Sequence, residues 1–287
     1  MSQALRDLVA EELAQPVDPR VTAMSAAIAA RYPQAARAVL FYGSCLRQKQ
    51  LDGLMLDFYL IVSSYREAYG RSWLAPANRL VPPNVFYFEH DGLHAKYAVL
   101  SEADFHRLNG PETRNVSVWA RFAQPSRLVW AADVQAKEHA IDAVARAIPT
   151  LLGAAMTAAQ ASTDPLDVWR GAFALTYSAE LRAERAGRSG SVVDADPHRY
   201  RRFTRAGLAA ATLQESSWAR RRVEGKLLSL LRLAKASATF SGGPDYIAWK
   251  INRHAGTDIV LKPWQRRFPL LAAISLLPRL LRSGAVR

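Results

Sequence analysis

The chain reads Val39-Leu40-Phe41-Tyr42-Gly43-Ser44-Cys45 and then, after a short loop, Leu54-Met55-Leu56-Asp57-Phe58-Tyr59-Leu60-Ile61-Val62. Both runs are apolar, aromatic and β-branched and have the length of a strand, which predicts two buried strands. A buried strand has no reason to carry a carboxylate such as Asp57 unless that charge is paired or binds a metal. Glycine lets backbone N–H groups approach a ligand closely, and the neighbouring serine adds a hydroxyl donor. We therefore expect Gly43 and Ser44 to hold phosphate and Asp57 to hold a divalent cation; a simple turn beside a paired polar residue is the alternative.

Composition narrows the class of protein. The chain has 287 residues, half of them hydrophobic, 22% charged, with a formal net charge of +13. This length predicts two domains, and the excess of positive charge predicts an anionic partner such as nucleotide, nucleic acid or an acidic membrane surface. One cysteine, Cys45, excludes an internal disulfide framework and a cysteine-based zinc site, and favours a reducing compartment. The first 15 residues resemble neither a signal peptide nor a transit peptide, and no apolar run reaches 18 residues.

The hydrophobic pattern predicts a small mixed α/β domain followed by helices. Strands are expected over 39–42, 55–62, 84–89 and 93–100, with a compact turn at His90-Asp91-Gly92 between the last two. Helices are expected over 3–14, 20–32, 116–122, 134–149, 150–162, 166–186, 205–215 and 218–238. Ser101 and Asp104 resemble a helix cap, and 191–196 is expected to be a short extended piece.

The C-terminal stretch differs from the rest. From Lys262 onwards there is no acidic residue, and cations flank the apolar run Phe268–Leu277, with Trp264 upstream. That run is too short to span a bilayer but has the composition of an interfacial anchor. We expect residues 262–287 to bind a membrane surface; a helix packed on the core with its cations in solvent is the alternative.

Several motifs, taken in order along the chain, resemble one family. Gly43-Ser44 followed by Asp57 is similar to the nucleotidyltransferase superfamily, although Tyr59 stands where a second carboxylate is usual. The wider order resembles the mitochondrial-type phosphatidate cytidylyltransferases over roughly 37–205. It consists of Tyr42-Gly43-Ser44, Met55-Leu56-Asp57-Phe58, Val85-Phe86-Tyr87, Lys96-Tyr97-Ala98-Val99-Leu100-Ser101, Arg121, Pro125 and Leu175-Thr176-Tyr177-Ser178-Ala179-Glu180-Leu181-Arg182. Two positions depart from the family pattern, because Cys45 replaces a glycine and Glu180 replaces an aspartate.

The resemblance implies a fold and an activity. The expected fold is α+β, with a nucleotidyltransferase-like mixed sheet domain over 1–115, a helical, winged-helix-like domain over 116–255 and an amphipathic, membrane-binding tail over 256–287. The implied reaction transfers CMP from CTP to phosphatidic acid with release of pyrophosphate. Because no import presequence is evident, the implied setting is the cytoplasmic face of a bacterial inner membrane, with the protein held peripherally on the anionic membrane surface and no nucleic acid as partner.

The resemblance also implies roles for named residues. Asp57 would bind Mg²⁺, a cation that carboxylate and phosphate oxygens share readily. Asp52 is the expected second metal carboxylate, with Glu89 and Asp91 as alternatives. Lys96 would act with Asp57 in catalysis. The expected contacts to CTP or to the lipid phosphate come from Gly43, Ser44, Arg121, Tyr177, Ser178 and Arg182.

Two other functions stay open at this point. A nucleotidyltransferase acting on RNA or on a small-molecule hydroxyl would have the same site chemistry, although the apolar, basic C-terminus argues against RNA. A non-catalytic, membrane-bound scaffold with a degenerate nucleotide site is supported by Tyr59 in place of the second carboxylate.

Overall fold

A mixed five-stranded sheet forms the centre of the molecule. In this computed structural model the strand order is β3-β4-β2-β1-β5, with β2 and β4 parallel and the other neighbours antiparallel. The strands are β1 (Ala36–Tyr42), β2 (Met55–Val62), β3 (Asn84–His90), β4 (Leu93–Ser101) and β5 (Ser126–Ala131). The structure describes residues 2–48, 50–156, 162, 164–180, 188–214, 217–239 and 260–267. The fold class is α+β, as predicted.

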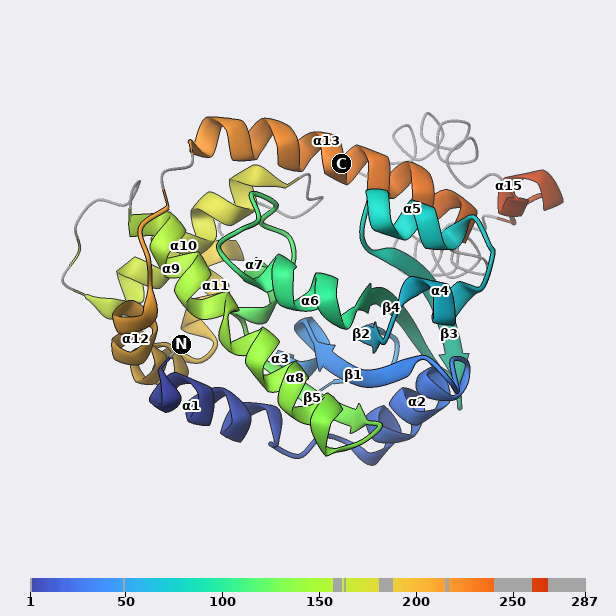
Figure 1. Cartoon of the computed structure of the whole chain (residues 1–287), viewed down its shortest axis with the longest axis horizontal. Helices are drawn as coiled ribbons and strands as arrows, with labels where there is room; N and C mark the ends of the chain where they lie inside the picture. The colour runs from blue at the N-terminus through green and yellow to red at the C-terminus, as the bar shows by residue number, and fades with distance from the viewer. Residues whose placement is uncertain are drawn as a thin grey trace.

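Helices surround the sheet and extend to one side of it (Figure 1). Those before β5 are α1 (Gln3–Leu13), α2 (Pro19–Ala30), α3 (Ser44–Gln48), α4 (Tyr65–Tyr69), α5 (Leu74–Leu80), α6 (Glu102–Asn109) and α7 (Trp119–Phe122). Those after β5 are α8 (Val134–Ala145), α9 (Ala147–Met156), α10 (Pro165–Ala179), α11 (Arg188–Asp194), α12 (Pro197–Ala210), α13 (Trp218–Thr239) and α15 (Pro263–Arg267). Among these described helices, none is long and apolar enough to cross a bilayer.

Strand alternation divides the interior into two cores. On β2, Leu56, Phe58, Leu60 and Val62 pack into a core with α2, whereas Tyr59 and Ile61 pack on the opposite face with α1 and α6 to α12. Side chains alternate between the two faces of a strand, so Asp57 lies on the same face as Tyr59. The carboxylate is therefore on the side of the sheet that the larger set of helices covers.

Local signals in the sequence are found where they were predicted. Ser101 caps α6 by accepting a hydrogen bond from the backbone N–H of Asp104 at 3.2 Å. The hairpin between β3 and β4 turns through Asp91 and Gly92, both with positive φ (47° and 72°), a conformation that Asp-Gly favours. The four predicted strands are present, with β1 beginning three residues before the predicted start.

Other expectations need correction or lie outside the described residues. The strand β5 was not predicted: its partly buried side chains lack clear alternation, and it joins the sheet only by pairing with β1. The segment expected to be extended over 191–196 is largely the helix α11. Because β5 comes from the range assigned to the second domain, the sheet extends past the predicted boundary at 115, and the division of the chain stays a prediction. Most of the predicted tail lies outside the described residues.

Candidate active site

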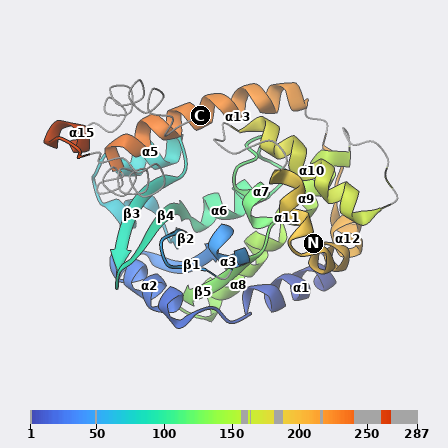
Figure 2. The same cartoon turned by 180° about the vertical axis from the view of Figure 1, so that it is seen from behind.

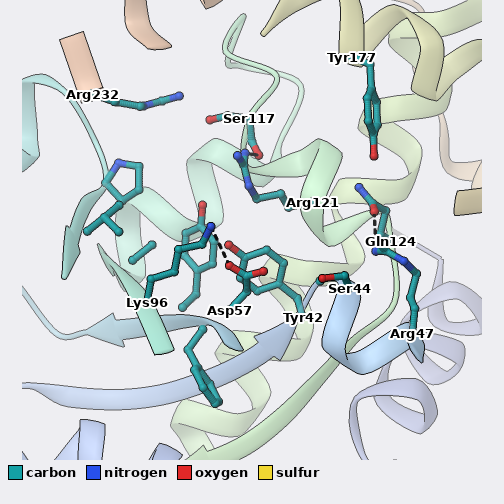
Figure 3. Close-up of a pocket in the computed structure, with 16 residues that line it drawn as sticks. Tyr42, Ser44, Arg47, Asp57, Lys96, Ser117, Arg121, Gln124, Tyr177 and Arg232 are labelled. Atoms are coloured by element: carbon teal, nitrogen blue, oxygen red, sulfur yellow. Dashed lines mark hydrogen bonds and ion pairs between the residues drawn. The ribbon is translucent and has the colours of Figure 1, made fainter. Parts of the chain in front are cut away.

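Three charged or polar side chains lie in one row across neighbouring strands. Asp57 of β2 is paired in register with Tyr42 of β1 on one side and with Lys96 of β4 on the other. The Lys96 ammonium nitrogen lies 3.1 Å from Asp57 Oδ1, and this oxygen is buried and accepts no hydrogen bond from the described residues. All three residues line a cavity of about 300 Å³ between the sheet and the helices (Figure 3).

Gly43 brings the end of β1 against the carboxylate of Asp57. It has φ +95°, which favours glycine, and a Cβ atom at this position would lie 2.6 Å from Asp57 Oδ2. The backbone then turns directly into α3, whose first residue, Ser44, also lines the cavity. Gly43 is therefore fitted to the carboxylate on the next strand, and Ser44 lies in the same cavity lining.

Helices supply the opposite wall of the cavity. Arg121 of α7, Tyr177 of α10 and Arg232 of α13 line it; Figure 3 shows Arg121 and Arg232 above Asp57 and Lys96, and Tyr177 pointing toward Gln124. Arg47 of α3 closes one end, where it donates a hydrogen bond to Gln124 Oε1 at 3.2 Å. Residues from β2 and α13 thus meet here although they are far apart along the chain.

The cavity is strongly cationic. Its described lining holds four cationic side chains, Arg47, Lys96, Arg121 and Arg232, and a single carboxylate, Asp57. Such an excess of fixed positive charge binds polyanions and stabilises charge that develops on phosphate oxygens.

Arg121 and Arg232 lie in different electrostatic environments. Burial lowers the pKa of Arg121, but Glu180, 3.3 Å away, and nearby tyrosines outweigh burial, so its pKa is raised. Burial, followed by repulsion from Arg121, lowers the pKa of Arg232. Arg232 donates through Nε to the Pro82 carbonyl at 2.7 Å, whereas its buried Nη2 has no hydrogen-bond partner among the described residues. A buried guanidinium with an unused donor is costly unless an anion accepts from it.

Two tyrosines of the cavity, Tyr42 and Tyr59, have raised pKa values and are neutral. Burial raises the pKa of Tyr42 well above its ordinary value, and the nearby Asp57 carboxylate raises it further. Burial likewise raises the pKa of Tyr59. Tyr59 lies two residues after Asp57 on the same face and packs against Phe122 and Tyr42, so an aromatic side chain fills the place of a second strand carboxylate.

Six of the residues singled out from the sequence line this one cavity: Gly43, Ser44, Asp57, Lys96, Arg121 and Tyr177. Sequence reasoning did not assign Arg47, Gln124 or Arg232 to the site. Arg47 lies four residues beyond Gly43, and this proximity was a usable signal. For Arg232 there was none, because it reaches the cavity through the packing of α13 on β3 and α10.

Other predicted residues lie elsewhere. Asp52 does not line the cavity; it is exposed and pairs with Arg20 of α2 at 3.0 Å. The alternatives, Glu89 and Asp91, are also outside the lining and pair with His94 and His90. Ser178 is exposed and donates its hydroxyl hydrogen to the Leu175 carbonyl. Arg182 lies outside the described residues.

The side chains that could coordinate a metal ion in the cavity are few. Among the described residues, no group of three or more histidine, cysteine or acidic side chains is arranged to hold an ion. Asp57, with a buried oxygen that accepts no hydrogen bond, fits the role of one carboxylate ligand. Mg²⁺ is often held by one or two carboxylates together with substrate phosphates and water, and the cavity fits that arrangement.

Comparison with known proteins adds little to this geometry. Protein-family models and curated proteins give no match to the chain. A solved structure described as a nucleotidyltransferase-like protein from Exiguobacterium sibiricum is similar at a TM-score of 0.29 and 12% sequence identity, covering 92% of each chain. A similarity at this level carries no argument about function.

Proposed function

We propose that this protein transfers a nucleotidyl group from CTP to the phosphate of phosphatidic acid, forming CDP-diacylglycerol and releasing pyrophosphate. One observation carries the proposal: the partly buried carboxylate of Asp57 faces a cationic cavity and lies directly against the Gly43-Ser44 turn. This geometry supports nucleotidyl transfer as the class of reaction. The choice of CTP and of phosphatidic acid comes from the motifs that resemble the phosphatidate cytidylyltransferases.

The nucleotide phosphates would lie along the sheet wall. The backbone at Gly43 leaves room for phosphate oxygens to approach, and Ser44 and Arg47 supply a hydroxyl and a guanidinium beside it. Asp57 would hold Mg²⁺ shared with those phosphates, and the ion, when bound, neutralises charge on the triphosphate. Lys96 would place a second positive charge next to the same carboxylate.

The acceptor is proposed to be a phosphate because the cavity offers no obvious base. The described lining contains no histidine, two of its three tyrosines, Tyr42 and Tyr59, have raised pKa values, and its single carboxylate is paired with Lys96. A hydroxyl acceptor has to lose a proton during transfer, which usually requires a general base. A phosphomonoester loses its second proton near pH 6 and is already a nucleophile at neutral pH.

The transfer then needs positioning and charge stabilisation rather than proton removal. An acceptor phosphate oxygen forms a new bond to the α-phosphorus, and the bond from that phosphorus to the oxygen bridging to the β-phosphate breaks. Arg121 and Arg232 on the helical wall would hold the acceptor phosphate by charge-assisted hydrogen bonds. Pyrophosphate leaves with the electron pair of the broken bond.

The test measures pyrophosphate and lipid product from phosphatidate vesicles with each of the four nucleoside triphosphates and Mg²⁺. We expect product with CTP alone and a loss of about 10³-fold in the Asp57→Asn variant, since removing the carboxylate charge removes the cation site. Asp52→Asn is the matched control, because Asp52 lies outside the cavity lining, and it should retain activity. An RNA primer and glycerol serve as alternative acceptors, and product from either instead of phosphatidate would contradict the proposal.

A non-catalytic nucleotide-binding protein is the second candidate. The observation that favours it is Tyr59, which is buried where a second carboxylate would lie. In that case CTP would bind, the Asp57→Asn substitution would weaken its binding, and no nucleoside triphosphate would give product with any acceptor.

A further inference from the structure

The helix α13 has two faces of different character. Its inner face closes the cavity: Arg232 lines the cavity and donates to the Pro82 carbonyl, and Lys235 donates to the Val81 carbonyl one turn further on. Gly225 lies on the same side, so close to α10 that a Cβ atom would be 2.2 Å from the Ala179 carbonyl oxygen. This face is therefore fixed in position by contacts along the helix.

The outer face carries large apolar side chains in solvent. Val223, Leu227, Leu230 and Leu231 are exposed to 69%, 57%, 54% and 45%. Their spacing of four, seven and eight residues puts them on one stripe, and at 3.6 residues per turn this stripe lies opposite Arg232. We call these four residues the outer stripe. A contiguous exposed apolar surface of this kind marks a binding surface.

Cations border the outer stripe. Arg220, Arg222 and Lys226 are exposed on the same helix; at helical spacing Arg222 and Lys226 lie along one side of the stripe, and Arg220 lies in line with it, one turn before Val223. The acid on this segment, Glu224, is neutralised by Arg220 at 2.8 Å and by Arg114 at 3.4 Å. The whole chain carries a net charge of +13. The surface is thus apolar along the outer stripe and cationic along one of its margins.

The helix α13 lies at the outer margin of the described part of the fold. Figures 1 and 2, which view the molecule from opposite sides, both show α13 running along the outer margin of the fold, with α15 beyond its end. Trp264 of α15 is 44% exposed, and the sequence that follows α15 is the apolar, basic run predicted to bind membranes.

We propose that the outer stripe of α13 docks on an anionic lipid bilayer, which places the membrane on the far side of the helix that supplies Arg232 to the cavity. An amphipathic helix with apolar side chains on one face and cations beside them binds at such an interface, through burial of apolar surface and attraction to lipid phosphates. Both contributions are present on this face, because Arg222 and Lys226 lie beside the four apolar side chains of the outer stripe. The inference rests on the proposed function, because docking on the bilayer would bring the phosphate of phosphatidic acid close to the cavity that uses it.

The experiment compares the wild type with the triple variant Val223→Ser/Leu227→Gln/Leu231→Gln. These side chains are exposed, so the variant should fold and unfold as the wild type does. Leu213→Gln is the matched control, because Leu213 is 67% exposed but lies outside α13. Flotation with phosphatidylcholine vesicles containing about one-third phosphatidylglycerol should show wild-type and control binding, at least tenfold weaker binding of the triple variant and little binding to pure phosphatidylcholine.

Activity separates this inference from the proposed function. With phosphatidate embedded in vesicles the triple variant should lose about tenfold in rate, whereas with a short-chain, monomeric phosphatidate it should match the wild type. Equal vesicle binding by wild type and variant would overturn the membrane assignment. A wild-type dimer in sedimentation equilibrium that becomes a monomer in the variant would also overturn it, in favour of a second copy as the occupant. Absence of transfer to the monomeric lipid by the wild type would refute only the proposed function, because the flotation result does not depend on catalysis.

Discussion

The two walls of the cavity are built in different ways. The sheet wall uses residues from three adjacent strands and the turn after β1, all within the segment 42–96 and held in register by backbone hydrogen bonds. The helical wall uses single residues from α7, α10 and α13, which are positioned only by the packing of helices on one another and on the sheet. The sheet wall therefore depends on local pattern, whereas the helical wall depends on contacts between distant parts of the chain.

The largest effect should come from breaking a long-range contact of the helical side. Arg199 of α12 is buried, pairs with Glu12 of α1 and donates to the Ala123 carbonyl at the end of α7. Glu12→Ala leaves this guanidinium buried without its counter-charge, which should lower the free energy of unfolding by about 3–5 kcal/mol. Urea denaturation measures it.

The adjacent residue provides the control for that prediction. Glu11 forms an exposed pair with Arg202 between the same two helices, and exposed pairs contribute little. Glu11→Ala should leave the urea midpoint almost unchanged. Equal destabilisation by the two substitutions would show that helix contact in general, rather than the buried pair, holds the helical wall.

A smaller effect, specific to catalysis, is expected on the sheet wall. Gly43→Ala places a methyl group 2.6 Å from Asp57 Oδ2, so the carboxylate must move. We expect kcat/KM for CMP transfer to fall by about 10²-fold, because displacing a cation-binding carboxylate by an ångström misaligns the reacting groups. Gly70→Ala controls for backbone strain, since Gly70 also has positive φ but has nothing within 4 Å of the added Cβ atom. If both variants lost the same activity, strain rather than contact with Asp57 would be the cause.

The sequence predicted the sheet wall well for a physical reason. A run of apolar residues interrupted by one carboxylate is informative because burial of that charge has to be compensated, and alternation then determines the face on which it lies. The motif at Gly43-Ser44 was informative because a larger residue than glycine at position 43 would clash with the Asp57 carboxylate. Asp52 lies outside the cavity lining for a physical reason: proximity in sequence does not bring a loop carboxylate into a cavity, and Arg20 of α2 pairs with it instead.

The helical wall was predicted only in part. Arg121 and Tyr177 were found through motif resemblance, whereas α13 was predicted as a helix but without a role for Arg232. Composition alone does not distinguish Arg232 from Arg220 and Arg222, which lie on the same basic helix. Only the packed structure shows that one points inward and the others outward.

Arg232 therefore offers a direct test of the helical wall. Arg232→Gln removes the charge and the unused buried donor while keeping a polar side chain. We expect the KM for phosphatidate to rise about tenfold, equivalent to about 1.4 kcal/mol of binding free energy, with a smaller change in kcat. Arg220→Gln, on the outer side of the same helix, should leave the KM for monomeric phosphatidate unchanged. A wild-type KM in the Arg232 variant would remove α13 from the site.

The smallest expected effect is the contribution of Lys235, on the inner face of α13, to the pH dependence of the free energy of unfolding. Burial, and then repulsion from Arg232, lower the pKa of Lys235 to about 7 in the native state, against 10.5 for an exposed lysine. Between these values the unfolded chain binds more protons than the folded one, so the contribution of Lys235 to stability rises with pH from about 7 to about 10. In Lys235→Met this contribution is absent, and the urea midpoint should therefore rise less between pH 7 and pH 9 than in the wild type. A steeper rise of the urea midpoint in the variant would contradict this prediction. It would mean that Lys235 stays charged in the native state, where it donates to the Val81 carbonyl of the segment before β3.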